Sequence, residues 1–301
     1  MRNEAGERNL RLRWLVVTAG ALGLLATASL AIAAGLSTKS KGVAVGPDET
    51  ATVAAKCKQG QKAVSGGFQA PVASDPEQDP TIIPHASHKQ GGREWSTAAQ
   101  NFGENAGDLT SFAYCRDGDK LTRKSLSVTI APEGGIGSAK VSCPRGEKAI
   151  SGGFEHADFE LGTRELVPYE SRKQGGRKWI VSGLNIESDP ATLTAYVYCR
   201  EGKGLKKASK TATAGPSIFE MGNEVVGSGK ATAKCDKGQR VVSGGFDNPD
   251  FDQDRESGPQ LFPTVSKKKG GRKWTVTSLN NGLVGGTVKA FAYCEKKLRR
   301  T

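Results

Sequence analysis

Serine is a candidate for nucleophilic chemistry in this chain, because it recurs three times in the same surroundings. Ser65, Ser151 and Ser243 each precede a pair of glycines. A nucleophilic serine needs a base, usually histidine, and often a sharp Gly-x-Ser-x-Gly turn. That turn motif does not occur in the sequence, and none of the three histidines recurs with the serines. We therefore interpret these serines as parts of a turn or bulge.

Two histidines could bind a metal, because imidazole is a common ligand of transition metals. His85 and His88 lie three residues apart beside Pro84, and the sequence offers only one other histidine, His156. A cysteine-based site would need Cys-x-x-Cys pairs, which the sequence lacks. We expect His85 and His88 to be surface-loop residues, and we assign no metal and no cofactor.

Alternating carboxylates occur in a segment of variable length, where they could chelate calcium or serve a glycoside hydrolase. An EF-hand requires a glycine and a closing glutamate, and the third copy has Arg255 and Leu261 at those positions. We expect solvated turns, with a secreted hydrolase acting through these loops as an alternative. The carboxylates are Asp75, Glu77 and Asp79 in the first copy, Asp158 and Glu160 in the second, and Asp250, Asp252 and Asp254 in the third.

The most informative candidate is a pair of basic residues around Gly-Gly, which occurs three times. Paired glycines are typical of a two-residue β-hairpin turn. Three cationic hairpin tips could bind phosphates or carboxylates, with weak contacts multiplied by repetition. Alternatively, the charges keep sheet edges soluble. The residues are Lys89 and Arg93, Lys173 and Arg177, and Lys268 and Arg272.

All these candidates belong to a threefold internal repeat. Each copy reads C-x-x-G-x-[KR]-x-[VI]-S-G-G-F, then P-x-x-S-x-K, G-G-R-x-W and finally [AV]-Y-C. Each tryptophan lies 20 residues before the closing cysteine. The recurrence establishes a duplicated scaffold and says little about ligands. We expect the repeated tryptophans to pack in the core; they are Trp95, Trp179 and Trp274.

Six cysteines, two in each copy, predict a disulfide framework in an exported chain. The separations within a copy are 58, 56 and 59 residues, whereas the gaps between copies are 28 and 36. This regularity favours one bridge within each copy, worth about 4 kcal/mol in the chain-entropy model. The predicted pairs are Cys57 with Cys115, Cys143 with Cys199 and Cys235 with Cys294.

The pattern of each copy predicts an all-β fold, because short runs of alternating apolar residues are separated by glycine-containing turns. Glycine within the S-G-G-F strand predicts a bulge. One more strand is expected in 121–137 and in 205–229. We predict three tandem disulfide-linked antiparallel β-sandwich-like modules, or alternatively a threefold β-prism built jointly by the copies. The expected boundaries are a linker at 34–48 and repeats at 49–131, 135–215 and 223–301.

Residues 1–33 have the layout of a secretory signal, with four arginines followed by an apolar run and small residues. Cleavage is our preferred interpretation. The alternative is an uncleaved N-terminal hydrophobic helix, since residues 14–36 carry no charge and could cross about 30 Å of hydrocarbon. The net charge is +12, and removing residues 1–33 would lower it only to +10. Export and the alternation of basic and acidic segments argue against nucleic-acid binding.

The repeated motifs are similar to a module of uncharacterised exported proteins from high-GC Gram-positive bacteria. The module also resembles the C-terminal domain of some bacterial collagen-like proteins. The resemblance covers nearly all of the exported part and implies an all-β extracellular unit, without implying an activity or site residues. The present chain has three copies and no Gly-x-y tract, so a stalk function does not carry over.

The sequence therefore predicts an exported, non-enzymatic repeat protein at the cell envelope or in the medium. Its expected role is adhesive or structural, with an anionic wall polymer or surface glycan as partner. A membrane-tethered surface protein without a ligand is the alternative alongside the hydrolase.

Overall fold

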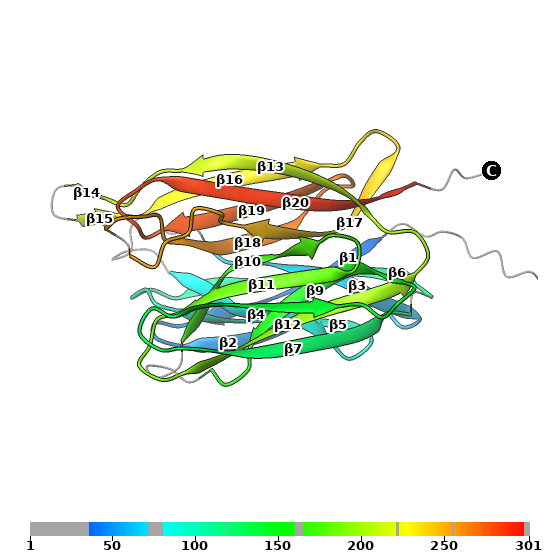
Figure 1. The fold of residues 1–301 in the computed structure, drawn as a ribbon, viewed down its shortest axis with the longest axis horizontal. Helices are drawn as coiled ribbons and strands as arrows, with labels where there is room; N and C mark the ends of the chain where they lie inside the picture. The colour runs from blue at the N-terminus through cyan, green and yellow to red at the C-terminus, as the bar shows by residue number, and fades with distance from the viewer. Residues whose placement is uncertain are drawn as a thin grey trace, which may run out of the picture. The chain divides into compact units, whose positions relative to one another are not determined.

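The computed structural model describes residues 36–71, 81–118, 120–159, 165–220, 223–254 and 256–297 (Figure 1). The predicted signal peptide or N-terminal hydrophobic helix lies outside these residues, as do the carboxylates at 75, 77, 79 and 160. Within Ala34–Thr301, which forms one compact unit, the regular secondary structure of the described residues is β-strand. The all-β prediction is confirmed.

Each repeat contributes six strands in the same order. In the first they are β1 (Ser37–Val45), β2 (Thr50–Lys56), β3 (Gln61–Gln69), β4 (Ile82–Gln90), β5 (Glu94–Asn101) and β6 (Gly107–Asp117). In the second they are β7 (Thr122–Ile130), β8 (Ile136–Ser142), β9 (Glu147–His156), β10 (Leu166–Gln174), β11 (Lys178–Asn185) and β12 (Ala191–Glu201). In the third they are β13 (Lys206–Ala214), β16 (Gly227–Lys234), β17 (Gln239–Asp247), β18 (Leu261–Lys269), β19 (Lys273–Asn280) and β20 (Gly286–Lys296), with a small extra hairpin, β14 (Ile218–Glu220) and β15 (Asn223–Val225).

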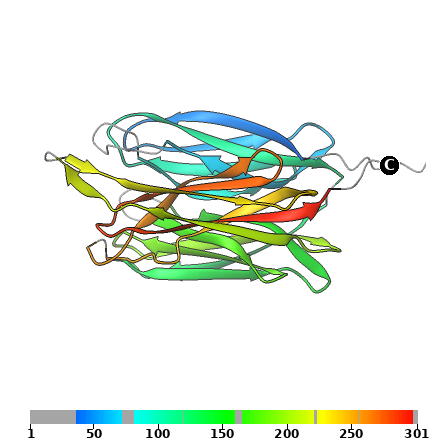
Figure 2. The same ribbon diagram turned by 90° about the horizontal axis from the view of Figure 1, so that it is seen from above.

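The strands form three antiparallel six-stranded sheets, and every sheet draws three strands from each of two repeats. Their orders are β1-β6-β3-β18-β19-β16, β13-β20-β17-β10-β11-β8 and β2-β5-β4-β9-β12-β7. The long strands of all three repeats run lengthwise in both views of the ribbon (Figures 1 and 2). Short ladders join the repeats, namely β3 with β18, β10 with β17 and β4 with β9.

The first strand of each repeat lies earlier in the sequence than expected. β1 falls within the segment predicted as a linker, and it pairs with β6 along its full length. β7, predicted to end the first repeat, pairs with β12 of the second. β13 likewise pairs with β20 of the third. The extra strands predicted in 121–137 and 205–229 therefore exist, and each begins the repeat that follows it.

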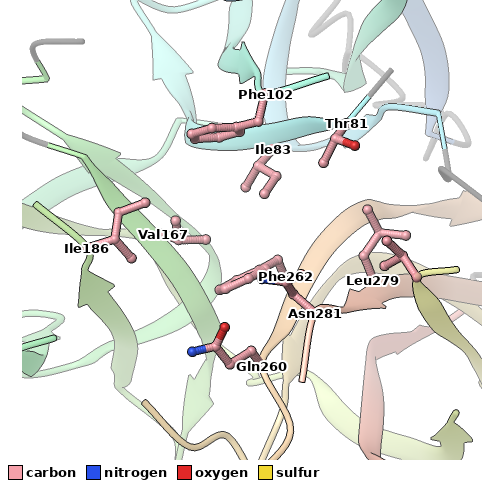
Figure 3. A pocket seen from close by; sticks show the side chains of 10 residues that line it. Thr81, Ile83, Phe102, Val167, Ile186, Gln260, Phe262, Leu279 and Asn281 are labelled. Carbon is pink, nitrogen blue, oxygen red and sulfur yellow. The ribbon is translucent and has the colours of Figure 1, made fainter. Parts of the chain in front are cut away.

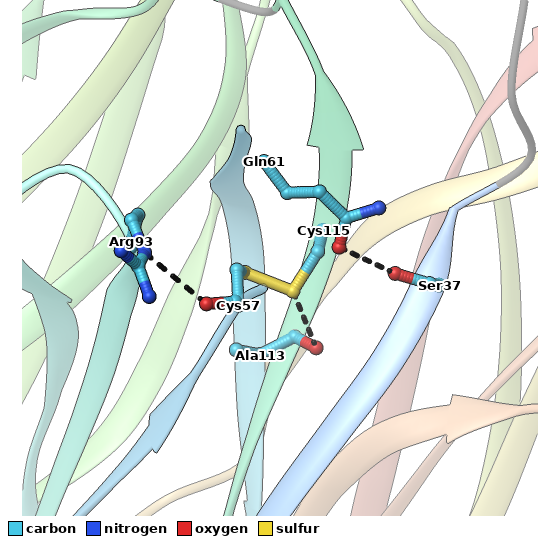
Figure 4. Close-up of a disulfide and its surroundings, with 6 residues drawn as sticks. All are labelled: Ser37, Cys57, Gln61, Arg93, Ala113 and Cys115. Carbon is cyan, nitrogen blue, oxygen red and sulfur yellow. Dashed lines mark hydrogen bonds between the residues drawn. A yellow bond between two sulfur atoms is a disulfide. The ribbon is translucent and has the colours of Figure 1, made fainter. Parts of the chain in front are cut away.

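The disulfides join the two three-stranded groups of each repeat. Cys57, just after β2, is bonded to Cys115 on β6 (Figure 4). Cys143 pairs with Cys199 and Cys235 with Cys294, with Cα atoms 5.7 and 5.8 Å apart. These are the pairs that the regular spacing predicts.

The tryptophans lie in the core, as predicted, and the glycine pairs explain how they fit. Trp179 is 1% exposed, and a Cβ on Gly152 would lie 2.2 Å from its ring. A Cβ on Gly153 would lie 2.4 Å from the carbonyl oxygen of Ser87, on β4 of the first repeat. The first glycine therefore admits the tryptophan of its own repeat, and the second admits the backbone of a neighbouring repeat.

The repeated serines connect the repeats in a closed ring. The hydroxyl of Ser65 donates to the carbonyl of Val242 at 2.6 Å, and the hydroxyl of Ser151 donates to Val64 at 2.6 Å. Ser243 completes the ring by donating to Ile150. Each acceptor lies at a register shift in its strand, which is the predicted bulge. A bulged residue leaves the ladder, so its carbonyl is available to another repeat.

Three equivalent phenylalanines pack together next to this ring. Phe68, Phe154 and Phe246 form edge-to-face pairs with ring centroids 5.9 to 6.2 Å apart. All three are 2% exposed. The S-G-G-F motif therefore builds the central contact among the three repeats, which gives a structural reason for its recurrence.

Candidate functional site

The basic residues predicted to bind anions lie where β4, β10 and β18 end. Gly91, Gly175 and Gly270 have φ angles of 63° to 66°, which is the left-handed conformation expected for glycine in such tight turns. The three hairpin turns predicted from the Gly-Gly pairs therefore exist at the end of each of these strands.

The lysine before each turn is hydrogen-bonded to the next repeat through the tyrosine that recurs before the closing cysteine. The backbone N–H of Lys89 donates to the hydroxyl of Tyr198 at 2.7 Å. Lys173 bonds Tyr293 in the same way, and Lys268 bonds Tyr114, both at 2.7 Å. The three bonds form a second closed ring between repeats.

Burial shifts the pKa values of lysines and tyrosines that form these bonds between repeats. It lowers the pKa of Lys173 and of Lys268, with further lowering by nearby cations. The ammonium of Lys268 lies 5.8 Å from the centre of the Tyr114 ring, and that of Lys173 lies 5.9 Å from Tyr293. Burial also raises the pKa of all three tyrosines. These lysines therefore pack against aromatic rings as well as adding positive charge.

Two of the predicted arginines bond the backbone beside the disulfides. Arg93 Nε donates to the carbonyl of Cys57 at 3.2 Å (Figure 4). Arg177 Nε donates to the carbonyl of Cys143 at the same distance. In the third repeat the carbonyl of Arg272 accepts the N–H of Cys235 at 2.8 Å. Each of these arginines therefore helps to fix its hairpin to the first cysteine of its repeat.

A carboxylate shared by all three repeats lies at the same end of the strands. Glu295 follows the last cysteine, where the other repeats have Arg116 and Arg200. Its carboxylate is bonded by Arg240 Nε at 2.7 Å and by Arg116, and it lies 3.7 Å from Arg200. One acidic side chain therefore neutralises part of a cluster of arginines.

A basic cleft opens beside the first hairpin. It has a volume of about 410 Å³, and its cationic lining consists of Lys62, Lys89, Lys120 and Arg123, with Tyr198. Lys89 is buried, whereas the other three cations are exposed. No carboxylate is among the described residues that line the cleft. A second hollow, of about 390 Å³, shares Lys62 and the Gly-Gly turn with it.

The sequence analysis missed Lys62, Lys120 and Arg123 as members of this cleft. Lys62 is part of the repeated C-x-x-G-x-[KR] pattern, so its recurrence was a usable signal. Lys120 and Arg123 precede or begin β7 in the second repeat, and their approach to the first hairpin depends on pairing between repeats.

The histidines lie on a strand, so their prediction as surface-loop residues is wrong. His85 and His88 both belong to β4. His85 stacks on Phe159 with ring centroids 4.1 Å apart, and burial lowers its pKa to about 3. His88 stacks on Tyr196 and its Nε2 lies 3.5 Å from Glu155. The described residues contain no group of three histidine, cysteine or acidic side chains placed to hold a metal ion.

Three of the described carboxylates in the variable loops accept hydrogen bonds. Asp158 accepts hydrogen bonds from the N–H and hydroxyl of Thr192 at 2.7 and 2.9 Å. Asp252 accepts the N–H of Asp254, and Asp254 accepts that of Glu256, both at 3.0 Å. The bond from Glu256 lowers the pKa of Asp254. These contacts organise turns, in line with the interpretation of the loops as solvated turns.

An apolar pocket, not anticipated from the sequence, lies where β4, β10 and β18 begin (Figure 3). Its volume is about 280 Å³. Ile83, Val167 and Phe262, each directly before the repeated proline, line it together. Phe102 and Ile186, each directly after the repeated asparagine, are 38% and 40% exposed at its wall. The repeat pattern did not reveal this pocket because these positions vary in residue type.

No protein-family model matches this chain, and a comparison with curated proteins found no similar sequence. No helix in the described part of the chain is long and apolar enough to cross a membrane.

Proposed function

We propose that this protein is an exported, non-enzymatic binding protein of the cell envelope, and that its basic end holds an anionic polymer. The basic cleft is the observation that carries this proposal. Three exposed cations line it together with buried Lys89. Phosphate or carboxylate groups gain charge-assisted hydrogen bonds from such cations.

Export is supported by the three disulfides, because disulfides persist in oxidising compartments and are rare in the cytosol. The partner is therefore a polyanion that is reachable outside the cytoplasm, such as a phosphate-bearing wall polymer. The contacts of Arg93 and Arg177 with cysteine carbonyls favour a positioning role for these arginines. We accordingly place the main binding contacts on Lys62, Lys120 and Arg123.

We further propose that the three repeats fold as one joint threefold β-prism rather than as separate sandwiches. The shared six-stranded sheets support this arrangement, as do the serine ring and the lysine–tyrosine ring. A joint fold would hold the basic cleft rigid, because its residues come from the first and second repeats.

The proposal predicts that the triple variant Lys62→Gln, Lys120→Gln, Arg123→Gln elutes from immobilised long-chain polyphosphate at lower salt. The slope of log affinity against log salt, which is negative, should also become less steep by about two to three, since each phosphate contact contributes roughly 0.7 to 0.9 to its magnitude in nucleic acids. Retention on isolated cell walls should fall in parallel.

A matched control removes the same charge elsewhere. Lys41, Lys140 and Lys210 are exposed on β1, β8 and β13, and their triple replacement by Gln should leave the salt slope nearly unchanged. Equal losses in the two triple variants would show that net charge alone causes retention, and the cleft would then have no specific role.

A further inference from the structure

The apolar pocket has the size and lining of a small-molecule site. An engineered cavity of about 150 Å³ can bind benzene, so about 280 Å³ suits a ligand close to twice that size. Phe102 and Phe262 line it with Ile83 and Val167 (Figure 3). Ligand sites are typically apolar with a few polar groups that fix the orientation of the ligand.

A small polar recess adjoins the pocket. Ile83, Phe102 and Val167 line both spaces. The recess is about 10 Å³ in volume and is bordered by His85 and Gln100, so it has room for about one water-sized group. Both ring nitrogens of His85 and Oε1 of Gln100 are buried without a hydrogen-bond partner among the described residues.

The side chain of Gln100 is unusual for its position in the repeat. The equivalents of Gln100 are Leu184 and Leu279, five residues after the tryptophan. A buried polar group without a hydrogen-bond partner destabilises the folded protein. Since leucine avoids that cost in the other two repeats, a ligand group that pairs with Gln100 would explain why the first repeat differs at this position.

We propose that the pocket binds an uncharged aromatic molecule about the size of two fused rings. Its hydroxyl or N–H group enters the recess beside His85 and Gln100. The aromatic body packs between Phe102 and Phe262. This site lies where β4, β10 and β18 begin, whereas the basic cleft lies where β4 ends, so the two proposals stand independently.

The recess selects against a charged ligand. Burial keeps His85 neutral at physiological pH, so the ring supplies one donor and one acceptor. Its ring also faces Phe159 and His156, and Gln100 Nε2 donates to buried Glu165 at 3.2 Å. A ligand carboxylate would approach Glu165 and lose its own hydration without gaining a cation. A hydroxyl can donate to Gln100 Oε1 and also bond the imidazole.

The first test titrates the full chain, in its oxidised form, with 2-naphthol, naphthalene and 2-naphthoate and follows ligand fluorescence. We expect one saturable site per chain for 2-naphthol, with at least tenfold weaker binding of the other two probes. Absence of saturable binding would overturn the proposal, as would equal affinity for 2-naphthoate. Tighter binding of decanol, with displacement of 2-naphthol, would assign the pocket to alkyl chains and would also overturn it.

The second test separates the pocket from the recess. Val167→Phe should fill the pocket and weaken 2-naphthol binding at least tenfold, whereas Leu126→Phe, at a position 46% exposed on β7, should have no effect. The double variant His85→Leu, Gln100→Leu should abolish the preference for 2-naphthol over naphthalene while retaining naphthalene binding. An unchanged preference in this variant, with its native melting transition intact, would refute the role of the recess.

Discussion

At the scale of single residues, the tyrosine of each [AV]-Y-C motif is both a core side chain and a hydrogen-bond acceptor. Tyr114 and Tyr293 are 1% and 0% exposed, respectively. Each hydroxyl accepts the N–H of a lysine in another repeat. Burial disfavours the charged phenolate and keeps each phenol protonated, which makes the stability of the folded molecule depend on pH.

We predict that stability falls steeply at alkaline pH. The pKa of Tyr114, Tyr198 and Tyr293 is raised in the folded state by burial. Their stabilisation is therefore complete below the unfolded-state pKa of about 10 and is lost as pH rises towards the folded-state value, by about 1.4 kcal/mol per pH unit for each tyrosine. The lowered pKa values of Lys173 and Lys268 have the opposite effect, so they make the folded state more stable as pH rises. This effect ends near pH 10.4, the pKa of lysine in the unfolded chain.

The measurement is urea unfolding between pH 9 and 11.5. Tyr293→Phe should lose about 1–3 kcal/mol at pH 8, since the N–H of Lys173 loses its acceptor, and it should show a shallower alkaline decline. An identical pH slope in the parent and the variant would contradict this explanation.

At the scale of elements, the packing of each tryptophan against the S-G-G-F strand depends on the first glycine of that motif. The position tolerates no side chain, because the tryptophan ring of the same repeat lies directly against the strand. The hairpin turn between the lysine and the arginine of each repeat also contains two glycines. Only the first of them has a positive φ angle, so only that position requires glycine for its backbone conformation. This difference gives a matched pair of substitutions.

We predict that Gly152→Ala destabilises the fold by about 1–3 kcal/mol or more, which is the usual range for overpacking a core. The new Cβ would lie 2.2 Å from the ring of Trp179. Gly176→Ala is the control, since nothing lies within 4 Å of its Cβ position. Denaturant melts of the two variants should differ clearly, and similar midpoints would show that the strand can move away from the tryptophan.

Much of the element structure could be predicted from the sequence, because its causes are local. Alternation predicted the strands, the Gly-Gly pairs predicted the hairpins, and regular cysteine spacing predicted the disulfides. The sequence left separate modules and a joint prism as alternatives and could not predict which strands pair between repeats, since Ser65 shows the same pattern whether its acceptor lies in its own repeat or in another. His85 and Gln100 were missed as neighbours of a pocket because they are not part of the repeated pattern.

At the scale of the whole molecule, each repeat has strand edges and an aromatic side chain that are paired or packed only by the other repeats. β3 and β4 of the first repeat pair with strands of the third and second repeats, respectively. Phe68 packs against the equivalent rings of both. A single repeat on its own would expose these strand edges and this ring to water.

We therefore predict that an isolated second repeat, residues 119–203, does not form a folded monomer even with its disulfide closed. The full chain should unfold in one cooperative transition, because small interdependent units melt together. Circular dichroism and sedimentation velocity would check both statements. A folded, monomeric single repeat would instead show that the modules are independent sandwiches.

The serine ring also constrains how such a protein can change in copy number. Each repeat donates to one neighbour and accepts from the other, which is a head-to-tail contact that closes after three steps. A gene encoding one copy could satisfy the same contacts as a homotrimer, and fusing three copies removes the concentration dependence of that assembly. Fusion also frees each copy to mutate alone, which is how one repeat could acquire His85 and Gln100 without altering the other two.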